Sequence, residues 1–218
     1  MGEAALERTC MRDRIRAVLV ARILDGTYPA GTQLKELALA REFGVSQAPI
    51  REALRELEGS GLVTSERFRG TRVRGADYEE MRESYELRCL MEVRAIELAA
   101  PFSKELVDEL AQCARGMASA VAKRDSERYI DQALAFHRRL IEASRNRTFL
   151  TVWDSLHWDV RARIALRRIA QPASGEALKP LIELHRALCA RLRAGDTRGA
   201  AENVRAIFSR ITSALATA

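Results

Sequence analysis

The 218-residue chain is 47% hydrophobic and 30% charged, and its formal net charge is +6. This length suffices for one large or two ordinary domains, and the composition is that of a globular rather than a disordered chain. No apolar run approaches the roughly 18 residues that span a membrane, and residues 1–16 lack an apolar signal core, so we expect a cytoplasmic protein with no membrane partner. In that compartment, cysteines without CxxC spacing are expected to stay reduced. They are Cys10, Cys89, Cys113 and Cys189.

Helical periodicity begins near the N-terminus. Residues 6–24 place apolar side chains at helical spacing, and Asp25-Gly26 ends this segment before a turn at residues 28–31. We expect this helix to support the elements that follow it. Its apolar positions are Ile15, Val18, Leu19, Ile23 and Leu24.

Residues 36–75 predict a helix, a tight turn, a second helix and a short basic hairpin. Leu37, Leu39 and Ala40 begin an apolar stripe that runs to Phe43. Gly44 then breaks the helix, and the next residue, a valine, is expected to pack inward across the turn.

The second helix is predicted to start after Ser46, which is a good N-cap, with Pro49 in its first turn. Ile50, Leu54 and Leu57 share one face at spacings of four and three residues. Two glycines, at positions 59 and 61, end the helix. The side chains left to point outward or along the flank are those of Gln47, Ala48, Arg51 and Arg55.

Residues 62–73 alternate in polarity around a turn at Arg69-Gly70, as a two-stranded wing would. From Ser60 to Gly75 four arginines stand against Glu66 alone, which gives this hairpin a net charge of +3. Such a patch can neutralise phosphates, although a merely solvated hairpin is the alternative. Its position beside a helix pair of the kind that enters the DNA major groove favours nucleic acid. The arginines are Arg67, Arg69, Arg72 and Arg74.

From Ala76 onward the pattern is helical throughout, without a strand-like run. Capping residues divide this part of the chain into six helices joined by short connections, with one loop at residues 171–175. Such helices pack most simply as an antiparallel bundle. The sequence therefore predicts a mainly α protein with a winged helix-turn-helix domain at residues 1–75 and an all-α domain at residues 76–218. The expected helices cover residues 77–100, 103–124, 126–144, 146–170, the segment that ends at Gly195, and 196–216.

Charged and imidazole side chains interrupt the apolar faces of three of these helices. Arg88 and Glu92 lie one turn apart inside the apolar stripe of residues 77–100, where a buried charge is costly unless it is paired. They could form a structural ion pair with each other or with a neighbouring helix. Alternatively, Arg88 could bind a ligand carboxylate while Glu92 holds the Arg88 side chain in place. His137 and His185 are central on two other apolar faces, which favours a shared site. The face occupied by His157 is not settled by the pattern, and packing is its default role.

Three stretches of the N-terminal third carry a family resemblance. They are YPAGT at residues 28–32 with Leu34 and Glu36, GVSQAPIREAL at residues 44–54, and LE-x-x-GLV at residues 57–63. This part of the chain resembles the winged helix-turn-helix of the GntR family of bacterial transcription factors. Many members of that family have Arg where Gln47 stands, and Gln suits contact with adenine whereas Arg suits guanine.

A second, more diffuse resemblance covers roughly residues 78–215. Arg88-x-x-x-Glu92, Phe136-His137 with Asn146, and His185 before Ala194-Gly195-Asp196 look like the FCD ligand-binding domain of the FadR branch of that family. The resemblance implies homodimers and a small organic-acid effector.

Many FCD domains hold a divalent metal with one Asp and three His. Projected here, His137 and His185 are retained, whereas Ala133 and Ile207 occupy the other two positions. Two ligands do not hold such an ion tightly, so no metal cofactor is expected, although Cys189 or Asn203 could substitute in part. The histidines would then donate hydrogen bonds to an anionic effector beside Arg88.

The leading interpretation is a ligand-responsive transcriptional regulator, most simply a repressor, that binds a palindromic DNA operator as a homodimer. An architectural DNA-binding protein with an effector-blind bundle is the alternative. An enzyme with Cys189 as nucleophile and His185 as base is disfavoured, because no orienting acid accompanies them. The candidate DNA-binding residues are Ser46, Gln47, Ala48, Pro49, Arg51, Arg55, Arg69, Gly70, Thr71 and Arg72. The candidate effector-binding residues are Arg88, Glu92, His137, His185 and Asn203.

Overall fold

The computed structural model describes residues 3–66, 69–74, 77–169 and 175–216. The chain divides into two compact units, Met1–Ala76 and Asp77–Ala218, which are described separately below as the N-terminal and the C-terminal unit. Arg67 of the expected wing, the expected domain boundary at residues 75–76 and most of the expected loop at residues 171–175 lie outside the described residues.

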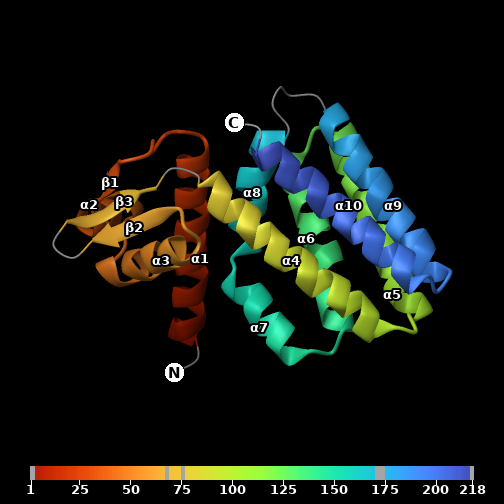
Figure 1. The fold of residues 1–218 in the computed structure, drawn as a ribbon. Helices are drawn as coiled ribbons and strands as arrows, with labels where there is room; N and C mark the ends of the chain where they lie inside the picture. Colours follow the sequence, from red (N-terminus) through yellow and green to blue (C-terminus); the bar gives the residue numbers. More distant parts are fainter. Residues whose placement is uncertain (1–2, 67–68, 75–76, 170–174, 217–218) are drawn as a thin grey trace. The chain divides into compact units, whose positions relative to one another are not determined.

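Three helices and a small sheet form the N-terminal unit (Figure 1). Ile15 and Leu19 of the first helix are buried with Ile50 and Leu57 of the third, so these two helices share one core. Val18 does not belong to this core, because 38% of its side chain is exposed. The elements are α1 (Glu3–Leu24), β1 (Gln33–Leu34), α2 (Glu36–Phe43), α3 (Gln47–Gly59), β2 (Val63–Glu66) and β3 (Gly70–Val73).

The turn between α2 and α3 depends on Gly44. Its φ of +65° lies in the left-handed region that glycine tolerates best, and its N–H bonds back to carbonyls of α2. Val45 is half-buried, and Ser46 has the extended conformation of an N-cap, although its hydroxyl makes no cap hydrogen bond. The predicted stripe on α2 was wrong at its first position, since Leu37 is 52% exposed while the buried residues are Leu39 and Ala40.

The wing is a three-stranded antiparallel sheet with strand order β1-β3-β2. Val63 pairs with Val73 at the buried end of the hairpin, and Glu66 pairs with Gly70 at the turn. The two-residue strand β1 adds to the outer edge of β3 through the pairing of Gln33 with Arg72, a strand that the alternation pattern did not predict. The side chain of Gln33 also donates to the Arg69 carbonyl at 3.0 Å, which ties the turn to β1.

Seven α-helices and one 3-10 helix make up the described part of the C-terminal unit. Four of the helices begin at side-chain caps of the expected kind, provided by Asp77, Ser103, Asp125 and Asn146. The elements are α4 (Tyr78–Ala99), α5 (Lys104–Ala122), α6 (Ser126–Ala143), α7 (Arg147–Ser155), α8 (Trp158–Ile169), η1 (Gly175–Leu178), α9 (Lys179–Arg193) and α10 (Thr197–Ala216).

The fourth predicted helix, residues 146–170, is in fact two helices. His157 has a φ of +47°, which no continuous α-helix can contain, and α7 therefore ends at Ser155 before α8 starts at Trp158. The side chain of Arg161 donates from Nε to the Leu156 carbonyl at 2.9 Å, so a carbonyl freed by the break keeps a hydrogen bond. His157 itself is half-exposed in the break and does not lie on a packed helix face.

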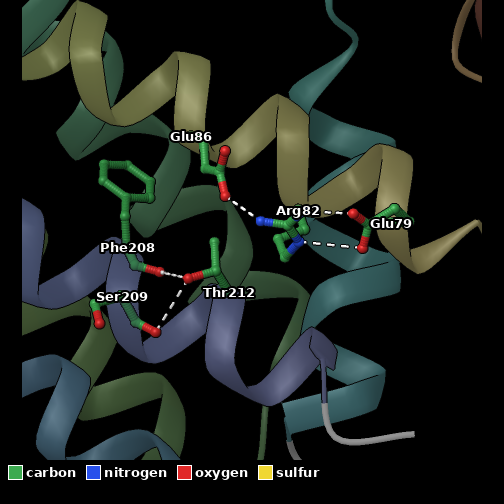
Figure 2. A network of polar contacts seen from close by, with 6 residues as sticks. All are labelled: Glu79, Arg82, Glu86, Phe208, Ser209 and Thr212. Atoms are coloured by element: carbon green, nitrogen blue, oxygen red, sulfur yellow. Dashed lines mark hydrogen bonds and ion pairs between the residues drawn. The ribbon is translucent and has the colours of Figure 1, made fainter.

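The helices of the bundle pack in neighbouring pairs, with α4 and α9 on either side of α10, and α5 against α6 (Figure 1). Figure 2 shows how α4 and α10 satisfy polar groups locally. Arg82 lies between Glu79 and Glu86 one turn to either side, and the Thr212 hydroxyl donates to the carbonyls of Phe208 and Ser209. Such exposed ion pairs contribute little to stability, so the bundle depends on its apolar core. Among the described residues, no helix combines the length and the apolar character needed to cross a membrane.

Candidate functional sites

The first candidate site is the outer surface of α3. Ser46, Gln47, Ala48 and Arg55 are exposed, and Pro49 is half-buried at the start of the helix. The buried face of the same helix holds it on the core, so its polar face is presented on a rigid element.

Arg51 is exposed on α3 but is not free of intramolecular contacts. Its guanidinium donates from Nε and Nη2 to the carboxylate of Glu36 at the start of α2, with a shortest distance of 2.8 Å. This two-point contact raises the pKa of Arg51 through hydrogen bonding and charge. Half of the Arg51 side chain remains open to solvent, so a base edge or a phosphate can reach it.

The wing presents three of the expected residues on its surface, Arg69, Gly70 and Arg72, and Thr71 is half-buried between them. Arg69 pairs with Glu66 across the turn at 3.1 Å, with 77% of its side chain exposed. Arg72 donates to the Gly31 carbonyl at 3.1 Å, and the Thr71 hydroxyl lies 3.0 Å from that of Ser65. Gly70 has a φ of +78°, which lets the hairpin close with little strain.

The second candidate site is a cavity inside the C-terminal unit. The space between its lining atoms, counted out into the solvent at its mouth, is about 520 Å³. Arg88, His137 and His185, which the sequence placed on three different helix faces, all line it. The remaining lining residues are Tyr85, Tyr129, Ile130, Ala133, Leu134, Ala162, Leu166, Ile169, Leu178, Leu181, Phe208 and Ile211.

Arg88 is a buried cation at the wall of this cavity, with only 4% of its side chain exposed. Its Nε donates to Oε1 of Glu92 at 2.8 Å, and its guanidinium carbon lies 4.6–5.8 Å from the centroids of four aromatic rings. Cation–π attraction stabilises a cation without neutralising it. Among the described residues, the two terminal nitrogens of Arg88 have no hydrogen-bond partner, so they can bind an anion in the cavity. The rings are those of Tyr85, Trp153, Trp158 and Phe208.

His137 and His185 meet edge to edge, with their Nε2 atoms 3.1 Å apart. The Nδ1 of His185 lies 2.6 Å from the Leu181 carbonyl, which can only accept, so this nitrogen carries the proton. The Nδ1 of His137 lies 2.5 Å from Oε2 of Glu92 and likewise donates when that carboxylate is ionised.

Burial opposes the charged form of both rings. Burial lowers the pKa of His185 to about 3, helped by the neighbouring His137. Burial also lowers the pKa of His137, and Arg88 adds to this effect, although the adjacent Glu92 opposes it. With the Nδ1 positions protonated, both Nε2 atoms present lone pairs. In this tautomer the pair offers hydrogen-bond acceptors to the cavity, whereas the sequence led us to expect donors toward an anionic effector, and that role stays a prediction.

Two tyrosines add phenolic hydroxyls that the sequence reading missed. Tyr85 and Tyr129 line the cavity, and burial raises the pKa of both, so each stays protonated. Both residues lie at the cavity wall, where their hydroxyls can bind a ligand. Their positions at helical spacing on apolar faces indicated only packing, and no sequence signal distinguished them from core residues.

Two expected effector residues lie outside the cavity lining. Glu92 is fully buried behind Arg88 and His137 and positions both. Asn203 is buried on α10, and its amide reaches the Leu184 carbonyl only at 3.5 Å.

The cavity residues do not form a divalent metal site. His137 and His185 supply two ligands, whereas Ala133 and Ile207 supply none. Within the described residues, no group of three or more His, Cys, Asp or Glu side chains is arranged to hold a metal ion. Since protein zinc sites use three or four ligands, the residues present do not fit the group.

Cys189 does not pair with His185 as a nucleophile would with its base. Burial raises the pKa of the Cys189 thiol to about 11, so the thiolate is not populated at neutral pH. The two ring nitrogens of His185 face the Leu181 carbonyl and His137 instead.

Comparison with known proteins gives the family. Residues 11–73 match the model of the bacterial regulatory proteins of the gntR family, and residues 83–210 match the FCD domain. The chain belongs to the GntR family and carries an FCD domain. It is a DNA-binding transcriptional regulator, which removes support from the effector-blind architectural alternative.

Curated GntR-type relatives include repressors of sugar operons. The chain is 30% identical over 191 residues to the "probable D-xylose utilization operon transcriptional repressor" of Paenarthrobacter nicotinovorans, with 88% of this chain and 82% of that protein covered. It is 32% identical over 155 residues to the gluconate operon transcriptional repressor of Bacillus licheniformis, with 71% of this chain and 63% of that protein covered.

Solved structures share the fold. A transcriptional regulator GntR from Rhodococcus sp. RHA1 matches with a TM-score of 0.74 at 22% identity, covering 94% of this chain and 96% of that one. The E. coli protein McbR/YncC matches with a TM-score of 0.73 at 21% identity over 94% and 96% of the two chains.

Proposed function

We propose that α3 and the wing bind a palindromic operator, and that a small carboxylate in the C-terminal cavity controls this binding as the effector of a cytoplasmic repressor. The observation that supports the second half most directly is Arg88, a buried cation at the cavity wall with unpartnered terminal nitrogens. The boundary between the DNA-binding domain and the effector-binding domain would fall at residues 75–76. No metal is required, because an arginine takes the place of a Lewis acid in attracting the carboxylate.

In the operator complex, α3 enters the major groove and the wing contacts the phosphate backbone. Gln47 and Arg51 are placed to read base edges, where Gln suits adenine and Arg suits guanine in bidentate contacts. The Glu36 carboxylate holds the Arg51 guanidinium in one orientation before DNA arrives, which lowers the entropy lost on binding. Arg55, Arg69 and Arg72 neutralise phosphates.

A palindrome requires two copies of the chain, and α4 offers a self-complementary face. Leu87 and Leu90 are exposed on α4 by 43% and 70%, which is unusual for leucines of a bundle helix. If two α4 helices pack antiparallel about a two-fold axis between these leucines, Leu87 meets the partner's Leu90 and Glu83 faces the partner's Arg94. Leu90→Glu would then raise the dimer dissociation constant at least tenfold, by roughly the burial energy of one leucine, in sedimentation equilibrium.

Effector control requires that the ligand bind two arrangements of the protein with different affinity. The experiment first selects operator sequences from a random duplex library with the full-length protein. Anisotropy titrations of a selected duplex are then repeated with a panel of monocarboxylates. We expect Gln47→Ala and Arg51→Ala to weaken operator binding about 10-fold or more. The exposed Arg198→Ala serves as the control. Unchanged operator affinity in Arg51→Ala would contradict the proposed DNA-binding surface. Operator affinity that does not change with any carboxylate of the panel would contradict the proposed effector control.

A further inference from the structure

We infer that the effector is a 2-hydroxy monocarboxylic acid with an apolar body, rather than a sugar acid, a plain fatty acid or an amino acid. The inference rests on the proposed function and names the ligand class of the same cavity. It follows from three features of the wall: one cation, two convergent acceptors and an apolar remainder.

The number of cations in the cavity wall limits the number of carboxylates that the ligand can carry. Arg88 is the one side chain with a fixed positive charge among the described residues that line the cavity, and no Asp or Glu lines it. One carboxylate can bind both terminal nitrogens of a guanidinium. A second carboxylate on the ligand would lie against apolar wall without a counter-charge, which is strongly unfavourable. The wall therefore fits a monocarboxylate.

The two histidines favour a ligand that carries a hydrogen-bond donor next to its carboxylate. Glu92 fixes the spacing, because its two oxygens hold Arg88 and His137 at once. Arg88 Nε and His137 Nδ1 thus face the same carboxylate. Because Arg88 and both imidazoles line one cavity, a small carboxylate bound to Arg88 can place its second carbon beside the histidines. The Nε2 lone pairs of His137 and His185, 3.1 Å apart, repel one another until a donor is shared with them.

A hydroxyl fits this position better than an ammonium group. An ammonium would add a second cation beside Arg88, and both oxygens of the nearest carboxylate, Glu92, already accept hydrogen bonds. A hydroxyl donates one hydrogen bond without adding charge, and it can accept one in return from a phenol such as Tyr85 or Tyr129.

The rest of the ligand meets aliphatic side chains. Ile130, Leu134, Leu166, Leu181 and Ile211 line the remaining wall. A polyol such as gluconate would bury several hydroxyls here without partners, and each unmade hydrogen bond opposes binding. A branched aliphatic or aromatic body instead gains from leaving water.

The test compares four six-carbon acids by titration calorimetry on the full-length protein. They are 2-hydroxy-4-methylpentanoate, 4-methylpentanoate, leucine and gluconate. We expect the hydroxy acid to bind about 10- to 100-fold more tightly than 4-methylpentanoate, and more tightly still than leucine or gluconate. His185→Phe should bring the hydroxy acid and 4-methylpentanoate to within about threefold of each other, whereas the exposed Arg186→Ala on the same helix should leave their ratio unchanged.

The outcomes separate this inference from the proposed function. If 4-methylpentanoate binds as tightly as the hydroxy acid and still alters operator affinity, the inference is overturned while the proposed function stands. Equal binding accompanied by proton uptake, measured in buffers of different ionisation enthalpy, would mean that a proton and not a hydroxyl bridges the Nε2 atoms, and it also overturns the inference. If gluconate or leucine binds most tightly of the four compounds, the inference is likewise overturned. Because the comparison between ligands is made on the unmodified protein, it is decisive even if His185→Phe fails to fold.

Discussion

The carboxylate of Glu92 binds Arg88 with one oxygen and His137 with the other, 2.8 Å from Arg88 Nε and 2.5 Å from His137 Nδ1. Glu92→Leu removes this carboxylate and leaves the Arg88 cation buried without a counter-charge. We expect a loss of about 3–5 kcal/mol in the free energy of unfolding, measured by urea denaturation. The double variant Arg88→Met/Glu92→Leu should recover much of it, since no unpaired charge remains. Additive losses in the double variant would show that the two side chains act independently.

Salt dependence distinguishes phosphate contacts from base contacts on the DNA-binding surface. Arg55→Ala should weaken binding to all duplexes to a similar degree and reduce the slope of log K against log salt concentration by about one. Gln47→Ala should leave that slope unchanged and relax the preference at one base pair, by about 1–3 kcal/mol. Anisotropy titrations at several salt concentrations measure both. A slope that falls equally in the two variants would contradict this division of roles.

The turn of the helix-turn-helix tests the backbone argument. A methyl group at Gly44 would meet no atom within 4 Å, so Gly44→Ala changes only the cost of the left-handed conformation at φ +65°. We expect a loss of about 1–2 kcal/mol in thermal unfolding, and a smaller loss for Gly44→Asn, because asparagine tolerates that region better. An Asn variant that is less stable than the Ala variant would argue against backbone strain as the cause.

The N-terminus of α10 provides a pH-dependent contribution to stability. The Gly199 N–H donates to Asp196 at 2.9 Å, and this bond together with Arg191 lowers the pKa of the Asp196 carboxyl. A lowered folded-state pKa adds stability above the ordinary carboxyl pKa of about 4, and this contribution is lost as the pH falls through the folded-state value. The Tm difference between the wild type and Asp196→Asn should therefore be present at pH 7, shrink below about pH 4, and decrease in high salt because the site is exposed. A difference independent of pH would show that the Asp196 charge is not its cause.

Restoring the two missing metal positions tests the interpretation of the histidine pair. In the double variant Ala133→Asp/Ile207→His, four ligands would be available, and Zn²⁺ should raise the Tm through preferential binding to the folded state. The wild-type Tm should not respond to Zn²⁺ at equimolar concentration. A stable zinc complex of the wild-type protein, detected after gel filtration, would show that two histidines are sufficient here.

Local patterns were enough to predict the helix-turn-helix. The glycine at position 44 and the apolar spacing of Ile50, Leu54 and Leu57 fix α3 within a few residues, because both signals arise inside the element. β1 escaped prediction because two residues carry no periodicity, and Gln33 is in a strand only through its pairing with β3. The break at His157 escaped as well, since neither Gly nor Pro marks it.

The candidate site was predicted in its charges but not in its hydrogen bonds. Arg88, His137 and His185 stood out because polar groups on apolar faces need an explanation, and the cavity brings all three together. Which nitrogen of each ring carries a proton depends on Glu92 and on the Leu181 carbonyl, neither of which can be related to the rings before the helices are packed. The tyrosines of the wall were overlooked for a similar reason, since a phenol at a core position gives no sign of whether its hydroxyl is satisfied.

The break at His157 also gives the protein an intrinsic optical reporter. In a continuous helix, Trp153 and Trp158 would point about 140° apart, whereas here both indoles lie within 5 Å of the Arg88 guanidinium carbon, at 4.6 and 4.7 Å. They are the chain's two tryptophans, and the N-terminal unit has none. Tryptophan emission therefore arises wholly from the two indoles beside the cation. A quench or a spectral shift on adding a metabolite would report events at that charge, and DNA binding by the N-terminal unit alone would leave the tryptophan emission unchanged.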